Sequence, residues 1–326
     1  MIDITFICDG GPRAGYGHVA RCIEIGKLIS EDHKGIKISF AGEYQNKISK
    51  RIATNFGESC LINICEIVSS KVIVIDRLSD PEDMNSWDEM LADKIRKLSS
   101  HRVALLSGDI DPGDDSFIRI GYQPGGPQPN PPSLLWGFDF APVAPGILDS
   151  KITTRDKNSI LIALGGSSNT SAAEEVLSAV KSMSEFSRVN ILMSPANRSD
   201  LREISGDIDL NIEFHENLPN IAPLLMQSGI VICSHGNLAY EAMALGAPVC
   251  LFAQKDFQKT LAARLAELGL VITAGQAGGK DKNDLVTALH KTYASANRLS
   301  SLSRESFDGD GLSRIAKIIS LGLLQS

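Results

Sequence analysis

Short apolar runs alternate with stretches of helical spacing in the first third of the chain. The apolar side chains of Ile2, Ile4, Phe6 and Ile7 predict a buried strand, and the apolar positions from Val19 to Gly26 recur at helical intervals. The same pattern predicts strands at Ile36 to Gly42, Val72 to Ile75 and Arg102 to Leu106, and helices at about Gln45 to Phe56 and Pro81 to Ser99.

Two irregular stretches separate this region from a second alternating one. Tyr122 to Pro132 is crowded with proline and glycine, and Ala141 to Asn158 is also irregular, so neither suits a long helix or a central strand. The second stretch is the expected domain linker. Beyond it the pattern predicts strands at Ile160 to Leu164, Val189 to Met193, Leu210 to Phe214, Ile230 to Cys233 and Val249 to Phe252, and helices at Thr170 to Met183, Ile221 to Gln227, Leu238 to Leu245, Phe257 to Leu268, Leu285 to Ala294 and Leu312 to Leu324.

Strands that alternate with helices of two or more turns predict βαβ units, parallel sheets and right-handed crossovers. The 326 residues suffice for two cores. We therefore expect an α/β fold of two Rossmann-like domains, residues 1–147 and 148–326, that face each other across a cleft. The last helix is expected to pack on one of the two domains, and it could pack back on the N-terminal one.

Composition narrows the class of protein. The formal net charge of -7 argues against a general nucleic-acid binder. No apolar run approaches the roughly 20 residues of a membrane span, and the N-terminus lacks signal-peptide features, so a cytoplasmic protein without membrane insertion is expected. The six cysteines form no C-x-x-C pair and are predicted to be reduced core residues. The histidine spacing indicates no helix-borne metal site, and the acidic segment Gly108 to Asp115 is more typical of a solvated turn than of a metal loop.

The loop before the first helix contains Gly15-Tyr16-Gly17-His18. Glycines leave backbone amides uncovered at a helix N-terminus, so this corner suits a phosphate beside a proton-transfer group. It does not complete a G-x-G-x-x-G fingerprint, and a nicotinamide-type domain is only weakly indicated. The simpler alternative is that His18 caps its own helix. Asp76 directly follows an apolar strand and is expected at the ligand-binding end of the sheet.

Two loops of the second domain are candidates for nucleotide binding. Gly165-Gly166-Ser167-Ser168-Asn169 follows a strand and opens a helix, where it either holds a phosphate or forms a capped glycine turn. Ser234-His235-Gly236-Asn237-Leu238 leads into a helix whose first turn is predicted to carry Glu241. Glu241 either accepts both ribose hydroxyls, while the loop amides hold a diphosphate, or only favours the helix dipole. Gln258 either binds a sugar hydroxyl or is polar helix surface.

Together these residues resemble the nucleotide-sugar enzymes of GT-B architecture, in particular the UDP-sugar hydrolase of pseudaminic acid biosynthesis and its relatives in surface-polysaccharide gene sets. The resemblance spans nearly the whole chain in the right order. It rests on G-x-G-H-x-x-R-C at Gly15 to Cys22, on Ile75-Asp76, on Leu164-Gly165-Gly166-Ser167, and on Ser234 through Pro248 with Gln258 beyond.

The resemblance implies an inverting hydrolysis, independent of metal or cofactor, that releases UDP from a diacetamido-trideoxy sugar. His18 would be the general base that activates water at the anomeric carbon. A helix N-terminus disfavours the imidazolium, which suits a base, and Asp76 would fix the tautomer if it reaches the other ring nitrogen. Charge on the departing diphosphate would be received by amides of Gly17, Gly166 and Ser234 to Leu238, and uracil by main-chain groups of Asn220-Ile221.

The sequence departs from the family pattern at two places that bear on which sugar the substrate carries. Leu78 stands where the hydrolase has an aromatic residue, and Val143-Ala144-Pro145-Gly146 replaces a leucine-arginine step. The first prediction is hydrolysis of a UDP-linked acetamido sugar to free sugar and UDP, in surface-polysaccharide or nonulosonic acid biosynthesis.

One alternative is a GT-B glycosyltransferase with a UDP-sugar donor, like the lipid-linked GlcNAc transferase of peptidoglycan synthesis, which shares the Gly-x-Gly-His loop. A membrane-borne acceptor would call for an apolar patch rimmed by bases, whereas the bases of the first domain look scattered. The second alternative is a non-catalytic nucleotide-sugar-binding protein.

Overall fold

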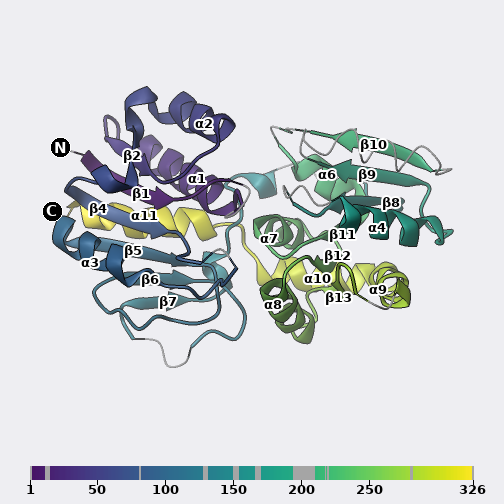
Figure 1. The fold of residues 1–326 in the computed structure, drawn as a ribbon. Helices are drawn as coiled ribbons and strands as arrows, with labels where there is room; N and C mark the ends of the chain where they lie inside the picture. Colours follow the sequence, from purple (N-terminus) through teal and green to yellow (C-terminus); the bar gives the residue numbers. More distant parts are fainter. Residues whose placement is uncertain are drawn as a thin grey trace. The chain divides into compact units, whose positions relative to one another are not determined.

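The chain forms two compact α/β units, each built around one parallel sheet (Figure 1). Unit 1 comprises Met1–Pro145 with Asp310–Ser326, and unit 2 comprises Gly146–Gly309. The computed structural model describes residues 2–11, 15–80, 82–127, 131–149, 154–165, 170–193, 210–216, 218, 220–279 and 282–324.

The sheet of unit 1 has seven strands in the order β3-β2-β1-β4-β5-β6-β7, and all neighbours are parallel. The chain first builds outward from β1 on one side and then continues from β4 on the other, so the strand order reverses between β1 and β4. Ligands of parallel α/β sheets bind at such a reversal, at the carboxyl ends of the strands. The strands are β1 Ile2–Cys8, β2 Ile38–Ala41, β3 Leu61–Ile62, β4 Ser70–Asp76, β5 His101–Leu106, β6 Ile118–Gly121 and β7 Leu134–Trp136.

Helices cover both faces of this sheet. Helices α1 (Gly17–Asp32), α2 (Asn46–Phe56) and α11 (Gly311–Leu324) share one core with it, while α3 (Glu89–Leu98) packs on the opposite face. The returning helix α11 buries a stripe at helical spacing, which fixes it to unit 1 (Figure 1). The members of that stripe are Leu312, Ile315, Ala316 and Ile319.

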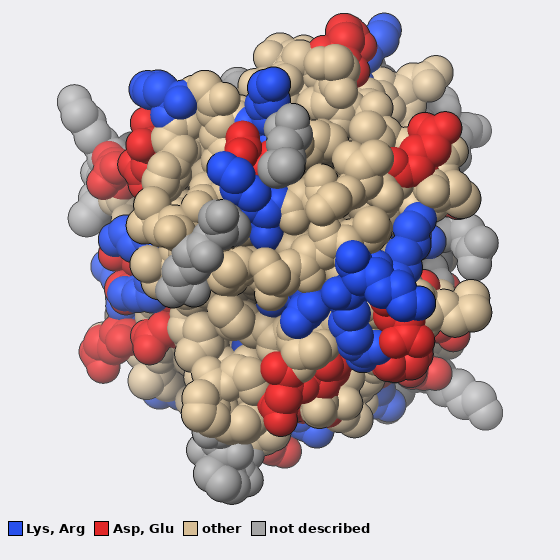
Figure 2. All heavy atoms as spheres, turned by 90° about the vertical axis from the view of Figure 1, so that its left-hand side faces the viewer, with Lys and Arg blue, Asp and Glu red and all other residues tan. Residues whose placement is uncertain are grey.

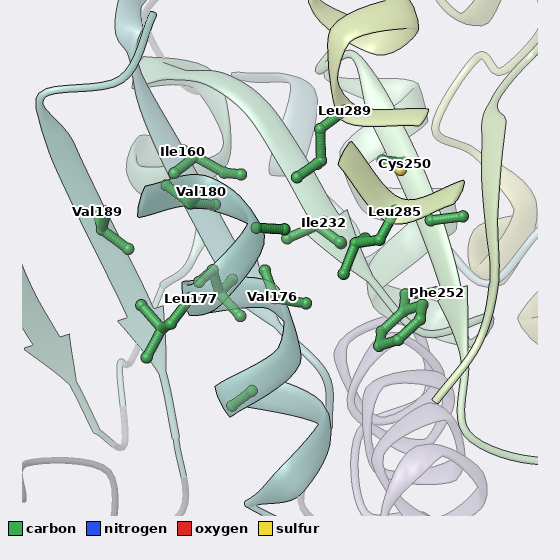
Figure 3. Packing of buried hydrophobic residues seen from close by; sticks show 14 of the residues in the cluster. Ile160, Val176, Leu177, Val180, Val189, Ile232, Cys250, Phe252, Leu285 and Leu289 are labelled. Atoms are coloured by element: carbon green, nitrogen blue, oxygen red, sulfur yellow. The ribbon is translucent and has the colours of Figure 1, made fainter. Parts of the chain in front are cut away.

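Unit 2 repeats this plan with six parallel strands in the order β10-β9-β8-β11-β12-β13. Helices α4 and α9 lie over one face, where Val176 and Leu285 meet Ile232 and Phe252 of the sheet (Figure 3). The elements are β8 Asp156–Ala163, α4 Ser171–Lys181, β9 Arg188–Leu192, β10 Asn211–His215, α6 Ala222–Gln227, β11 Ser228–Cys233, α7 Asn237–Ala244, β12 Val249–Ala253, α8 Asp256–Glu267, β13 Ile272–Gln276, α9 Lys282–Ala294 and α10 Ala296–Ser306.

The predicted fold of two parallel-sheet α/β domains is confirmed, although several elements were not predicted. These are the short strands β3 and β7, together with β6, β13 and α10. The predicted helix from Pro81 begins only at Glu89, because Asp88 caps it by accepting from the Leu91 amide at 2.9 Å. The irregular stretch predicted to reach Asn158 ends earlier, since β8 begins at Asp156.

The acidic segment between β5 and β6 is partly exposed, as expected of a solvated turn, but three of its carboxylates pair with arginines. Arg119 of β6 is fully buried, and its guanidinium pairs with Asp111 at 2.5 Å and with Asp115 at 3.0 Å. Asp114 pairs with Arg96 of α3. This buried arginine also explains why β6 lacks the apolar run of a predictable strand.

Five cysteines are buried as predicted, but Cys65 is exposed. No helix in the described part of the chain is long and apolar enough to cross a membrane. On the face in Figure 2, the largest group of lysine and arginine side chains is bordered by acidic ones, and smaller basic groups lie elsewhere on the same face.

Candidate active site

The loop that leads into α1 depends on close backbone packing. A Cβ at Gly10 would lie 2.6 Å from Cγ1 of Val19, so only glycine lets the loop pass this close to the helix. The Gly15 amide donates to the carbonyl of Gly11 at 2.8 Å, and Gly15 has a φ of 77°. This closed loop delivers His18 as the second residue of α1.

His18 lies against the carboxyl end of β4. Its Nδ1 is 2.7 Å from Oδ1 of Asp76, whose side chain is completely buried, and the His18 side chain is 10% exposed. The N-cap residue of α1 is Tyr16, which makes no side-chain cap hydrogen bond, so His18 at the second position is not the N-cap of its own helix. Burial opposes ionisation of Asp76, but the charge of Arg21 and then that of His18 outweigh it and lower the Asp76 pKa to about 2.

The ionised carboxylate determines which ring nitrogen of His18 is free. Since Asp76 can only accept, Nδ1 carries the proton and donates it. In the neutral ring Nε2 is then the acceptor. An imidazole held in this tautomer by a buried carboxylate can take a proton from a hydroxyl or a water, a contribution of about 10²- to 10⁴-fold in rate.

A shell of polar side chains surrounds the carboxylate. Arg21 donates through Nε to Oδ2 of Asp76 at 2.7 Å and through Nη2 to Oδ1 at 2.6 Å. Its remaining contacts are Nη1 to the Tyr122 hydroxyl and Nη2 to the Ser107 hydroxyl, both at 2.9 Å. Cys22 donates weakly to Oδ2 at 3.6 Å. Asp76, Ser107 and Tyr122 come from the carboxyl ends of β4, β5 and β6, so the cluster lies at one edge of the sheet.

Unit 2 carries a second polar edge, at the ends of β8, β11 and β12. The Ser234 hydroxyl donates to the carbonyl of Leu164 at 3.3 Å or of Phe252 at 3.2 Å, and it accepts from Nε2 of Gln254 at 2.8 Å. One serine therefore ties together three strand ends. Its hydroxyl serves the scaffold, so a nucleotide would meet the backbone amides of this loop.

Gln258 also belongs to this scaffold. Its Oε1 accepts from the amides of Gln254 at 2.8 Å and Lys255 at 3.2 Å, and its Nε2 donates to the carbonyl of His235 at 3.3 Å. The side chain thus joins the loop before α8 to the loop before α7. Its interpretation as plain helix surface is wrong, and one Nε2 hydrogen remains for a ligand.

The loop before α7 is partly buried. His235 is 6% exposed and meets the Tyr240 ring edge-on at 5.8 Å, and burial lowers its pKa to about 4, so it is neutral near pH 7. A Cβ at Gly236 would meet nothing within 4 Å, so space beside the backbone is open there. Asn237 and Leu238, the first residues of α7, are half-buried.

Glu241 is the fifth residue of α7, so its predicted position in the first turn is wrong. The helix begins at Asn237, and a charge on its second turn gains little from the helix dipole. The half-buried carboxylate is therefore not explained by the dipole alternative.

The remaining predicted substrate contacts are in the loop after β8 and at the start of α6, and some of them lie outside the described residues. Gly165, with a φ of 94°, ends the segment after β8, and Gly166 and Ser167 lie outside the described residues. Asn220 accepts from the Ala222 amide at 2.9 Å at the start of α6, next to Ile221.

Unit 1 thus brings together Gly15, Gly17, His18 and Asp76, while unit 2 brings together Ser234 to Leu238 and Gln258. Sequence reasoning assigned no role to Arg21, Ser107, Tyr122 or Gln254. Arg21 stands three residues after His18 on a mostly apolar helix, which is the signal that could have found it. In the described part of the chain no three His, Cys, Asp or Glu side chains are grouped as a metal site.

No family model matches the chain. It is 24% identical over 283 residues, 78% of its length, to an uncharacterised protein, MJ1062, of Methanocaldococcus jannaschii, and 25% identical over 171 residues, 51% of its length, to the spore coat polysaccharide biosynthesis protein SpsG of Bacillus subtilis. These matches cover 56% and 50% of the relatives, so the chain spans about half the length of the curated relatives it matches.

Solved structures share the fold over nearly the whole chain. MurG of Acinetobacter baumannii superposes with a TM-score of 0.64 at 12% identity, covering 98% of this chain and 99% of MurG. The calicheamicin glycosyltransferase CalG4 gives 0.65 at 13% identity, covering 100% and 99%. MnaA of S. aureus, solved with UDP, gives 0.59 at 14% identity, covering 100% and 98%. The fold is therefore that of the GT-B glycosyltransferases.

Proposed function

We propose that the chain is an enzyme that transfers a sugar from a UDP-sugar to an acceptor hydroxyl, with His18 as the general base. The observation that carries the proposal is the Nδ1 contact of His18 with the buried carboxylate of Asp76, 2.7 Å long, at the carboxyl edge of the first sheet. The proposal is also supported by the similar folds of the calicheamicin glycosyltransferase CalG4 and of MnaA, which was solved with UDP.

The proposed step is a displacement at the anomeric carbon. His18 Nε2 takes the proton of the acceptor hydroxyl while the acceptor oxygen forms a bond to that carbon. The bond from the carbon to the diphosphate oxygen breaks, and the electron pair leaves with UDP. Asp76 keeps the Nδ1 proton in place and stabilises the imidazolium that forms.

Nucleotide binding is assigned to the polar edge of unit 2. The amides of Gly165 and of Ser234 to Leu238 are proposed to donate to the diphosphate, where each preorganised donor contributes a few kcal/mol to leaving-group stabilisation. Glu241 is proposed to accept the ribose hydroxyls, and the main chain at Asn220-Ile221 to bind uracil. Gly166 and Ser167 remain predicted members of this set.

Hydrolysis of the same donor is the second candidate. It is favoured by the G-x-G-H-x-x-R-C pattern at Gly15 to Cys22, which resembles the UDP-sugar hydrolase. A base that deprotonates a sugar hydroxyl can equally deprotonate water, so the two reactions need the same His18 and Asp76 and differ only in the nucleophile.

The deciding experiment follows UDP release from a panel of UDP-sugars, first without and then with candidate glycosyl acceptors. Release that depends on an acceptor supports transfer, and equal release without one supports hydrolysis. UDP binding with no turnover under any condition would refute an enzyme.

The variant His18→Asn tests the base directly. It should abolish turnover and leave UDP affinity within about twofold, since His18 is assigned no contact with the nucleotide. The matched control is His33→Asn, which changes a histidine just beyond the other end of the same helix. Wild-type rates in His18→Asn would remove this residue from the mechanism.

A further inference from the structure

Arg21 is a buried arginine that pairs with the carboxylate of Asp76. The residue is 3% exposed, and its side chain makes four hydrogen bonds: two to Asp76, one to Ser107 and one to Tyr122. The guanidinium carbon also lies 5.5 Å from the centre of the Tyr122 ring. A long cationic side chain is rarely buried this completely for packing alone.

We propose that Arg21 is a positioning residue that fixes the orientation of the Asp76 carboxylate and, through it, that of the His18 imidazole. The inference rests on the proposed role of His18 as the general base. Arg21 itself is three residues further along α1 and acts only through Asp76.

The geometry of the pair supports the positioning role. Arg21 grips the carboxylate side-on, with Nε on Oδ2 and Nη2 on Oδ1, so the carboxylate plane cannot rotate without breaking a charged hydrogen bond. Oδ1 is also the atom that accepts from His18 Nδ1. Arg21 therefore sets the orientation of the imidazole through the carboxylate that both side chains share.

The ends of β5 and β6 hold Arg21 in turn. Ser107 accepts from Nη2 and Tyr122 from Nη1, while the side chain of Gln123 donates to the carbonyl of Ser107 at 2.9 Å. Tyr122→Phe therefore loosens Arg21 without touching Asp76 or His18, and it provides a mild variant beside the direct ones.

The test compares Arg21→Gln, Arg21→Lys and Tyr122→Phe with the surface control Arg51→Gln, using the whole protein. The tautomer of the His18 ring is read by ¹⁵N NMR, and UDP release gives kcat and the donor KM. Arg21→Gln and Arg21→Lys should each lower kcat about tenfold, because both lose the two-point contact with the carboxylate. In Arg21→Gln part of the ring proton should move from Nδ1 to Nε2, because the carboxylate is no longer held towards Nδ1. Tyr122→Phe should change kcat less than threefold, and the donor KM should not change in any variant.

An unchanged tautomer and kcat in folded Arg21→Gln would overturn the inference. If Arg21→Gln fails to fold, wild-type kcat in Arg21→Lys would overturn it instead. The NMR measurement needs no turnover. A changed tautomer in a protein that turns over no UDP-sugar would therefore refute the proposed function and leave the role of Arg21 standing.

Discussion

The substitution Asp76→Asn keeps the shape of the aspartate side chain and removes its charge. Asparagine presents one acceptor and one donor where the aspartate accepts from His18, twice from Arg21 and weakly from Cys22. The amide must therefore point its N–H groups at another donor. Arg21 is left as a buried cation without a counter-charge.

Two estimates give the size of the effect on stability. Removing one partner of a buried ion pair costs about 3–5 kcal/mol. Independently, the Asp76 pKa falls from 3.8 to about 2 on folding. A difference of roughly two pKa units corresponds to about 2–3 kcal/mol. We expect a loss of about 2–5 kcal/mol at pH 7. Because the folded pKa is lowered, wild type has this stabilisation above pH 3.8 and loses it as the pH falls towards 2, whereas the variant lacks it throughout.

Both tryptophans, Trp87 and Trp136, lie in unit 1, so tryptophan fluorescence in a urea titration reports the unfolding of the unit that contains Asp76. Turnover should fall on the order of 10³- to 10⁴-fold, since the histidine tautomer is no longer fixed. Glu31→Gln, an exposed acid of α1, serves as the matched control. An Asp76→Asn protein with the wild-type urea midpoint and wild-type turnover would refute the reasoning for both the ion pair and the base.

Three other substitutions probe unit 2 and the first loop. Glu241→Ala should weaken UDP binding about 10- to 100-fold by calorimetry through loss of a charged acceptor, with Glu267→Ala as control; unchanged affinity would contradict the ribose assignment. Burial lowers the His235 pKa to about 4, so folding opposes protonation of this histidine by about 3 kcal/mol. His235→Gln should therefore reduce the loss of folding free energy between pH 6.5 and pH 4. Circular dichroism in urea at both pH values measures this loss, and a variant with the wild-type pH slope would disprove the prediction. Gly10→Ala should destabilise by about 1–3 kcal/mol because its Cβ would lie 2.6 Å from Val19, and adding Val19→Ala should relieve the clash; a double variant that merely sums the two losses would contradict this.

Much of the fold follows from local pattern. Apolar runs such as Val72 to Ile75 can only be central strands of a covered sheet, and their alternation with helices specifies parallel order. Local pattern did not predict elements whose burial depends on partners that are distant in the sequence. Strand β6 contains the buried Arg119, which is acceptable only because Asp111 and Asp115 fold back on it, and β7 is a three-residue edge strand.

For the site, the sequence by itself determined the position of single residues at the ends of elements. The glycine loop places His18 at a helix start, and the apolar run places Asp76 at a strand end. Only the tertiary structure decided that these two meet at 2.7 Å and that Arg21 grips the same carboxylate. Asp76 is 58 residues from His18 in the sequence, and such long-range contacts depend on sheet register and helix packing, which local pattern does not encode. Local spacing thus identifies the groups that can do chemistry, and packing decides which of them share a proton.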